Sequence, residues 1–296
     1  MADGSRALSV RPNILAQHQP GIVNRVTARD AGWDLLNMEV RRFEEGGTWA
    51  QDTAESEAAL VVLGGRCGVT SDKGEWPTIG RRPDVFSGMP YALYLPRRTE
   101  FVVTALSPRL EVAFCWVPTD EEHPVRLVTP EDCAIEVRGG HNATRQINSI
   151  IPPGFDCQRI VCVEVYTPGG NWSSYPPHKH DAHREDESGN LLEADLEELY
   201  YYKMSKPQGF AIQRVYTADR SIDAVMVCHD NDIVLVPEGY HPVAAAYGYD
   251  CYYLNFLAGS AQSLAYSDDP EHAWTKETWT AQGPGVPLVH HGMEAE

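Results

Sequence analysis

The sequence predicts an all-β protein made of two related β-domains, and three observations support this fold class. Helix signals are scarce in a chain of 296 residues that contains 24 glycines and 21 prolines. The apolar segments are short, rich in Val, Ile and Tyr, and bounded by Gly, Pro, Asp or Asn, as are the strands of β-sandwiches and barrels. Two such segments, one in each half of the chain, also resemble each other, which indicates an internal repeat.

The predicted strands follow one another through both halves of the chain. In the first half they are ALVVLGG (59–65), YALYLP (91–96), EFVVTAL (100–106) and EVAFCWV (111–117). In the second half they are RIVCVEVYT (159–167), LYYYKM (199–204), GFAIQRVYT (209–217), DIVLVP (232–237) and CYYLNFLAG (251–259). Only two weak helix candidates remain, a turn near Asn142–Ile150 and a helix after Ser260. The first 20 or so residues lack a periodic pattern and are expected to be mobile.

The internal repeat rests on two strands that each end in proline. Residues 91–100 (YALYLPRRTE) and 233–241 (IVLVPEGYH) have the same form, and aligning Pro96 with Pro237 places Glu100 opposite His241. We therefore predict an N-terminal domain over residues 1–148 and a C-terminal domain over residues 149–296.

Charge and composition exclude several classes of partner. The 24 basic and 42 acidic residues give a formal net charge of −18, which disfavours binding to nucleic acid or to an anionic membrane surface. No apolar run approaches a membrane span, and the N-terminal residues show no apolar signal segment, so a cytoplasmic protein is expected. The seven cysteines include no CxxC pair, which argues against a disulfide framework or a zinc knuckle.

A histidine pair is the sharpest local feature of the sequence. His178 and His180 lie two residues apart in the run PPHKHD, so in a strand both side chains would face the same side. An acidic pair, Glu197 and Glu198, opens the next predicted strand, and His241 follows a later one. Three imidazoles and one carboxylate from successive strands predict a site for a divalent ion such as zinc, manganese or iron. The acidic stretch 181–195 between them is expected to be a solvated loop.

The run GNWSSYPPHKHD (170–181) resembles the signature of the 5-deoxy-glucuronate isomerase family of myo-inositol catabolism, within the cupin superfamily. The segments LEELYYYK (196–203), GFAIQRVYT (209–217) and DIVLVPEGYHPVAA (232–245) are similar to the same family, and the resemblance covers roughly residues 22–280. It implies a bicupin made of two double-stranded β-helix, or jelly-roll, barrels. Because the N-terminal half has no HxH pair, the resemblance implies a first domain that has lost its metal.

The resemblance also implies a ligand set, namely His178, His180, one glutamate and His241. Glu197 and Glu198 face opposite sides of a strand, so only one of them can bind. In the related 4-deoxy-L-threo-5-hexosulose-uronate ketol-isomerase the ligand precedes an aromatic strand with the spacing E-x-Y-x-Y, and on this basis we predict Glu197.

The activity that the resemblance implies is the conversion of 5-deoxy-D-glucuronate to 5-dehydro-2-deoxy-D-gluconate. This aldose–ketose isomerisation builds negative charge on oxygen, which a divalent metal can stabilise as a Lewis acid, and it needs no organic cofactor. The alternatives are the related hexosulose-uronate ketol-isomerase of pectin breakdown, a cupin oxygenase and a non-catalytic sugar-binding cupin. The expected partner is a small deoxy-uronate, and a homo-oligomer is an open alternative.

Further residues are expected to contact the substrate. A uronate carboxylate needs a local cation in this anionic protein, and the candidates are Arg214, Lys179 and Arg159. The candidates for moving a proton near the metal are Glu198, Tyr240 and Tyr253.

Overall fold

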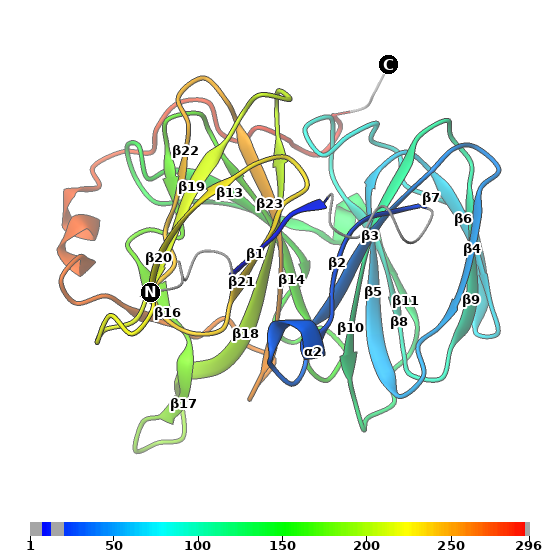
Figure 1. Cartoon of the computed structure of the whole chain (residues 1–296), viewed down its shortest axis with the longest axis horizontal. Helices are drawn as coiled ribbons and strands as arrows, with labels where there is room; N and C mark the ends of the chain where they lie inside the picture. The colour runs from blue at the N-terminus through cyan, green and yellow to red at the C-terminus, as the bar shows by residue number, and fades with distance from the viewer. Residues whose placement is uncertain (1–7, 13–20, 294–296) are drawn as a thin grey trace. The chain divides into compact units, whose positions relative to one another are not determined.

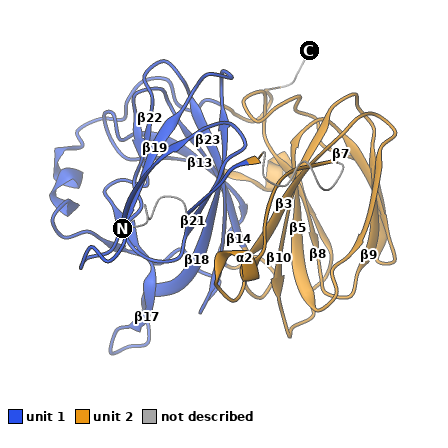
Figure 2. Ribbon diagram, in the orientation of Figure 1, with its two compact units in different colours: residues 1–11, 135–153, 161–288 blue, residues 12–134, 154–160, 289–296 orange. Residues whose placement is uncertain are grey.

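The computed structural model describes residues 8–12 and 21–293, and Figure 1 shows its course. The chain divides into two compact units (Figure 2). Unit 1 comprises residues 1–11, 135–153 and 161–288, and unit 2 comprises residues 12–134, 154–160 and 289–296. No helix in the described ranges is long and apolar enough to cross a membrane.

Unit 1 is built from two main sheets. The larger has the strand order β1-β21-β18-β23-β14-β13-β12, with β17 added beside β18, and the smaller has the order β15-β22-β19-β20. A short pair, β16 with β24, and a 3₁₀ helix, η3 (Ala273–Thr278), complete it. The strands are β1 (Ser9–Val10), β12 (Ala134–Arg138), β13 (Arg145–Ile151), β14 (Val161–Thr167), β15 (Trp172–Ser173), β16 (His178–Lys179), β17 (Asp181–Glu185), β18 (Leu191–Met204), β19 (Ala211–Tyr216), β20 (Asp223–Cys228), β21 (Ile233–Val236), β22 (Val243–Ala245), β23 (Cys251–Gly259) and β24 (Ser267–Asp268).

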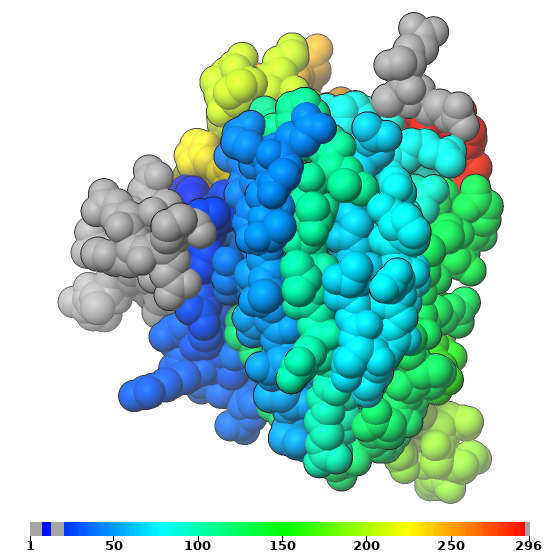
Figure 3. All heavy atoms as spheres, turned by 90° about the vertical axis from the view of Figure 1, so that its right-hand side faces the viewer, coloured from blue at the N-terminus to red at the C-terminus, as the bar shows by residue number. Residues whose placement is uncertain are grey.

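Unit 2 repeats this plan with two sheets of its own. Their strand orders are β11-β8-β5-β10-β3-β2 and β4-β9-β6-β7, and Figure 3 shows the second sheet's segments, in blue, green and cyan, on the face turned to the viewer. A one-turn helix, α2 (Ala28–Ala31), and a 3₁₀ turn, η2 (Pro130–Asp132), lie between strands. The strands are β2 (Ile22–Val26), β3 (Asn37–Phe43), β4 (Thr48–Asp52), β5 (Ser56–Gly64), β6 (Cys67–Ser71), β7 (Gly74–Ile79), β8 (Tyr91–Leu95), β9 (Glu100–Ala105), β10 (Leu110–Pro118) and β11 (Arg126–Val128).

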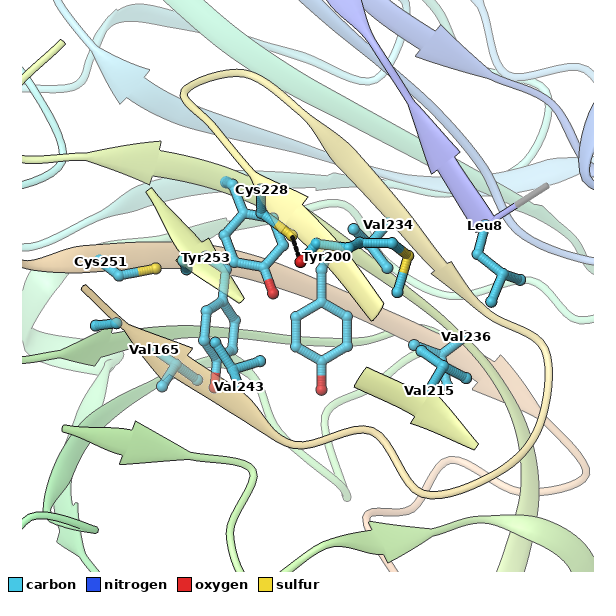
Figure 4. Close-up of a cluster of buried hydrophobic side chains, with 14 of the residues drawn as sticks. Leu8, Val165, Tyr200, Val215, Cys228, Val234, Val236, Val243, Cys251 and Tyr253 are labelled. Carbon is cyan, nitrogen blue, oxygen red and sulfur yellow. Dashed lines mark hydrogen bonds between the residues drawn. The ribbon is translucent and has the colours of Figure 1, made fainter. Parts of the chain in front are cut away.

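The core of unit 1 lies between its two sheets. Tyr200 and Tyr253 come from the larger sheet, Val215 and Val243 come from the smaller one, and all four are buried in one cluster (Figure 4). Leu8, next to strand β1, belongs to the same cluster. Because alternate residues of a strand face opposite sides, each sheet presents one apolar face to the other and closes a barrel-like sandwich.

The core of unit 2 is built in the same way around aromatic rings. Trp49 of β4 and Phe101 of β9 meet Phe114 of the opposite sheet, with the ring centroids of Trp49 and Phe114 5.2 Å apart. Edge-to-face ring contacts of this kind add to the free energy gained by burying the rings.

The predicted all-β fold of two barrels is confirmed, and the internal repeat is visible in the topology. β8 lies between β5 and β11 in unit 2 as β21 lies between β18 and β1 in unit 1, and β9 lies beside β4 as β22 lies beside β15. The aligned prolines, Pro96 and Pro237, follow β8 and β21 directly.

Several local expectations differ from the structure. The helical turn near Asn142–Ile150 is instead strand β13, because this segment pairs with β14 through a ladder that includes Gln146 and Tyr166. The helix after Ser260 is only the 3₁₀ helix η3. Residues 183–190 are exposed, as expected of a solvated segment, but residues 181–195 are not an irregular loop: β17 and the start of β18 form a hairpin, labelled at β17 in Figure 1, in which Glu193 is buried.

The division into units also differs from the predicted one. A boundary between residues 148 and 149 would cut β13, whose pairing with β14 places it in unit 1. Residues 154–160 return to unit 2, where backbone N–H groups of Gln158, Arg159 and Ile160 donate to the buried carboxylate of Glu57. Of the first 20 residues, which were expected to be mobile, 1–7 and 13–20 lie outside the described residues, and Ser9–Val10 forms β1.

Candidate metal centre

His180 and Glu198 meet at one end of the larger sheet of unit 1. His180 follows β16, and its Nδ1 lies 2.8 Å from the carbonyl oxygen of Leu196. A carbonyl can only accept, so Nδ1 carries the proton, and Nε2 presents a lone pair. That Nε2 lies 2.9 Å from Oε2 of Glu198, a carboxylate that is only 4% exposed.

His241 approaches the same carboxylate from the turn before β22. Its Nδ1 lies 2.8 Å from the carbonyl oxygen of Gly239, which again leaves a lone pair on Nε2. This Nε2 is buried, has no hydrogen-bond partner among the described residues and lies 3.2 Å from Oε2 of Glu198. Gly239 has φ +93°, and a Cβ there would lie 2.6 Å from the carbonyl oxygen of Tyr216, so the turn that presents His241 requires glycine.

Three acceptor atoms therefore converge with no donor between them. The ligand atoms of His180, Glu198 and His241 all lie within 4.8 Å of one another, and this is the sole such group of three or more within residues 8–12 and 21–293. Lone pairs and a carboxylate repel one another unless a cation sits among them. Two imidazoles whose other nitrogens are fixed by backbone carbonyls, together with a carboxylate, fit a divalent transition-metal ion.

The pKa shifts of this cluster reflect the same electrostatics. Burial raises the pKa of Glu198, but the close contacts with His180 and His241 outweigh burial and hold that pKa far below its usual range. Burial lowers the pKa of His180, but the contact with the Glu198 carboxylate outweighs burial, and the pKa of His180 is raised. The cluster thus favours positive charge beside a permanent carboxylate, which either protons or a metal ion can supply.

The structure places Glu198, not the predicted Glu197, at the cluster. In β18 Glu197 is opposite Ala258 and Glu198 is opposite Leu257, so the two side chains face opposite sides of the sheet. Tyr200 and Tyr202 follow Glu198 on its own face, which is the E-x-Y-x-Y spacing that we had assigned to Glu197.

His178 lies beside the cluster. Its ring centroid is 4.8 Å from that of His241 and 4.6 Å from that of Tyr266, and its Nδ1 is 3.4 Å from the carbonyl oxygen of Pro176. Burial and the neighbouring His241 hold the pKa of His178 well below its usual range, so its imidazole is neutral and able to ligate.

A cavity of about 310 Å³ opens onto this cluster inside unit 1. Its walls come from residues of β12, β13, β14, β18 and β23 and from the segments 174–180 and 264–279. Its polar and charged lining comprises Arg138, Arg145, Ser149, Ser174, Tyr175, His178, His180, Glu198, Tyr200, Tyr253, Asn255, Tyr266, Asp268, Lys276 and Trp279. Apolar walls with a few polar groups are typical of small-molecule sites.

The three predicted substrate-binding cations lie elsewhere. Arg214 makes two 2.8 Å hydrogen bonds to Asp223, and Lys179 is paired with Asp181 and Glu193. Arg159 belongs to unit 2. The cations that line the cavity are Arg138, Arg145 and Lys276, none of which we predicted.

Of the predicted proton-transfer residues, Tyr253 lines the cavity and Tyr240 does not. Tyr240 packs against Tyr216, with ring centroids 5.2 Å apart. The hydroxyl of Tyr253 lies 3.3 Å from Oγ of Ser174, which also lies 3.1 Å from the hydroxyl of Tyr200. Tyr200 and Ser174 were missed, although Tyr200 shares the alternation of Glu198.

Comparison with known proteins places this chain among sugar-acid isomerases. The KduI/IolB family matches residues 8–275. The chain is 43% identical over 270 residues to "5-deoxy-glucuronate isomerase" of Geobacillus thermodenitrificans (strain NG80-2), covering 90% of this chain and 96% of that protein. It is 37% identical over 259 residues to "5-deoxy-glucuronate isomerase" of Bacillus subtilis (strain 168), covering 86% and 93%.

Solved structures share the architecture. The crystal structure of an IolB-like protein from Salmonella typhimurium LT2 has a TM-score of 0.84 and 37% identity, with 90% of this chain and 98% of that chain covered. Oxalate decarboxylase of Lactobacillus farciminis has a TM-score of 0.65 at 11% identity, with 88% of each chain covered, and this likeness concerns the fold alone.

Proposed function

This chain belongs to the KduI/IolB family, and from that premise we propose that it converts 5-deoxy-D-glucuronate to 5-dehydro-2-deoxy-D-gluconate as a metal-dependent aldose–ketose isomerase. The observation that carries the proposal is the buried group of His180, Glu198 and His241 at a cavity of about 310 Å³. The expected cofactor is a divalent ion, with zinc, manganese or iron as candidates, because the donors do not separate them.

The side chains that would bind the ion already lie close to one another in the fold. His180, Glu198 and His241 would hold it, with His178 beside them as a further imidazole within reach of the same cavity. When bound, a divalent ion supplies Lewis-acid stabilisation of the negative charge that develops on the substrate's oxygen atoms. The reaction is redox-neutral overall, so we propose no organic cofactor.

Tyr253 is the best placed residue to hold a proton at the substrate. Burial raises the pKa of its hydroxyl to about 12, so the group stays neutral near pH 7 and can donate a hydrogen bond to a developing oxyanion. Ser174 contacts both this hydroxyl and that of Tyr200, which orients the pair. Leu196, Leu257 and Val163 give the same cavity apolar walls.

We also propose that unit 2 holds no equivalent ion, and the register of the repeat supports this. Ala58 is opposite Leu95 in unit 2, just as Glu198 is opposite Val236 in unit 1, so alanine replaces the carboxylate. Glu100 occupies the position of His241 after the aligned proline. The segment between β4 and β5 has three residues, 53–55, whereas the one between β15 and β18 carries both histidines.

The test is a direct assay of the purified protein. Incubation with 5-deoxy-glucuronate, followed by NMR, should show loss of the aldehyde and gain of the ketone, and EDTA should abolish it until a divalent metal is restored. The variant His180→Ala should lose both the ion and the turnover. Faster conversion of the hexosulose-uronate of pectin breakdown would assign the related activity instead, and turnover that survives in His180→Ala would refute the metal site. A cytoplasmic location and a homo-oligomeric state are further proposals for this protein.

A further inference from the structure

One basic side chain in the cavity of unit 1 has no acidic partner in the part of the chain that the structure describes. Arg138 is paired with Glu136 at 2.6 Å and Lys276 with Asp268 at 2.5 Å. Arg145 is only 6% exposed and forms no ion pair with any carboxylate in the described part of the chain. A buried cation without a counter-ion destabilises the folded protein, so its presence requires a physical explanation.

The backbone holds the guanidinium of Arg145 in place. Nη1 donates to the carbonyl oxygens of Ala143 at 3.2 Å and Tyr175 at 3.1 Å. Gly139, at φ +85°, passes so close that a Cβ would lie 2.8 Å from Nη1. The side chain therefore sits in a backbone cradle that only glycine permits at that position.

The other two nitrogens of the guanidinium, Nε and Nη2, are available to a ligand. Within the described residues no protein group accepts a hydrogen bond from Nε or Nη2 of Arg145. These two atoms form the edge that arginine offers to a carboxylate in a bidentate contact. Burial lowers the pKa of Arg145, yet arginine remains charged near pH 7.

We propose that Arg145 binds the carboxylate of the sugar-acid substrate through Nε and Nη2, and so selects uronates over neutral sugars; this inference rests on the proposed function. Arg145 lines the same cavity as His180 and Glu198 of the candidate metal group. The reacting aldehyde and the carboxylate are opposite ends of the substrate chain, so two anchors, one for each end, would orient it. In a protein with a net charge of −18, a local cation also overcomes the repulsion of an anionic substrate.

The test compares Arg145→Gln with Arg220→Gln, a matched surface substitution outside the cavity. Arg145→Gln should raise KM for 5-deoxy-glucuronate at least tenfold, with the metal content unchanged, because charge-assisted hydrogen bonds to the carboxylate are lost. It should leave the weak turnover of the neutral analogue 5-deoxy-glucose within about threefold of the native protein. Arg145→Lys, which keeps the charge but loses the fork, should lie between. Arg220→Gln should match the native protein with both compounds.

A binding measurement on the metal-loaded protein separates this inference from the proposed function. Calorimetry with D-gluconate, which has a carboxylate but no carbonyl group to isomerise, should show at least tenfold weaker binding in Arg145→Gln and no change in Arg220→Gln. If the native protein does not turn over 5-deoxy-glucuronate, the proposed function fails, and this arm still decides the role of Arg145. Equal gluconate affinity in Arg145→Gln and the native protein, or no measurable binding by either, would overturn the inference. Loss of binding that accompanies a large drop in melting temperature would indicate a structural role and would also overturn it.

Discussion

The sharpest prediction concerns the two adjacent glutamates of β18. Glu198→Gln keeps the size of the side chain but removes its charge, and Glu197→Gln makes the same change one residue away on the opposite face of the sheet. If Glu198 is the ligand, only the first substitution should release the ion. The pair is well matched because both side chains leave the same strand within the same hydrogen-bonded ladder.

The expected size of the effect follows from the geometry. Oε2 of Glu198 lies 2.9 Å and 3.2 Å from the two imidazole Nε2 atoms, so an ion held by all three is within a few ångströms of the carboxylate charge. Two unit charges 4 Å apart interact by about 4 kcal/mol at an effective dielectric of about 20, and the partner here would be a divalent ion. The amide oxygen of the glutamine can still coordinate the ion as an uncharged ligand, so the full electrostatic energy is not lost. We expect metal affinity to fall at least about 100-fold, which corresponds to about 2.7 kcal/mol.

The assay is elemental analysis of each variant after dialysis, followed by titration of the metal-free protein with Zn²⁺ or Mn²⁺. The native protein and Glu197→Gln should retain about one ion per chain, and Glu198→Gln should retain little. Circular dichroism of all three should coincide, which excludes unfolding as the cause. Loss of the ion from Glu197→Gln with retention in Glu198→Gln would refute the assignment made from the structure and restore the one made from the sequence.

Two further predictions test the packing around the site and the fold. Burial alone would raise the pKa of Glu193, but hydrogen bonds from Ser267 and Arg184 lower it to about 2. The ionised carboxylate should therefore add about 2–3 kcal/mol to the free energy of unfolding above pH 4.5, and this contribution should be lost as the pH falls through 2. Chemical unfolding should therefore show Glu193→Gln less stable at pH 7, with roughly a quarter of that difference left at pH 2.5, whereas a constant difference at all pH values would contradict this origin. In unit 2, Phe114→Ala should cost about 3–5 kcal/mol, because its ring is 1% exposed against Trp49 and Phe101, and the exposed Val102→Ala should cost little. Equal unfolding midpoints for these two variants would contradict the placement of that core.

The order of strands was largely predictable because local sequence patterns specify where the strands lie. Short apolar runs closed by Pro or Gly predicted most of the strands, and the matching forms around Pro96 and Pro237 predicted the repeat that the sheet orders now show. Strand β13 was missed because the segment RQINSII buries residues on both faces, so it lacks the alternation of polar and apolar residues that identifies a half-buried strand. That error also hid Arg145, since a residue in a predicted helical turn had no reason to face the cavity.

The sequence by itself determined the fold class, the family and the types of metal-binding side chain, because period-two patterns and the HxH pair are local properties of the chain. Even the identity of the carboxylate was within its reach, since Tyr200 and Tyr202 share the face of Glu198. Only the tertiary structure decided which cations line the cavity and which are paired elsewhere: Arg214 is paired with Asp223 and Lys179 with Asp181 and Glu193, whereas Arg145 forms no ion pair within the described residues. Whether a charge is free depends on which distant strand brings a carboxylate to it, and that pairing is settled by the packing of sheets rather than by any pattern along the chain.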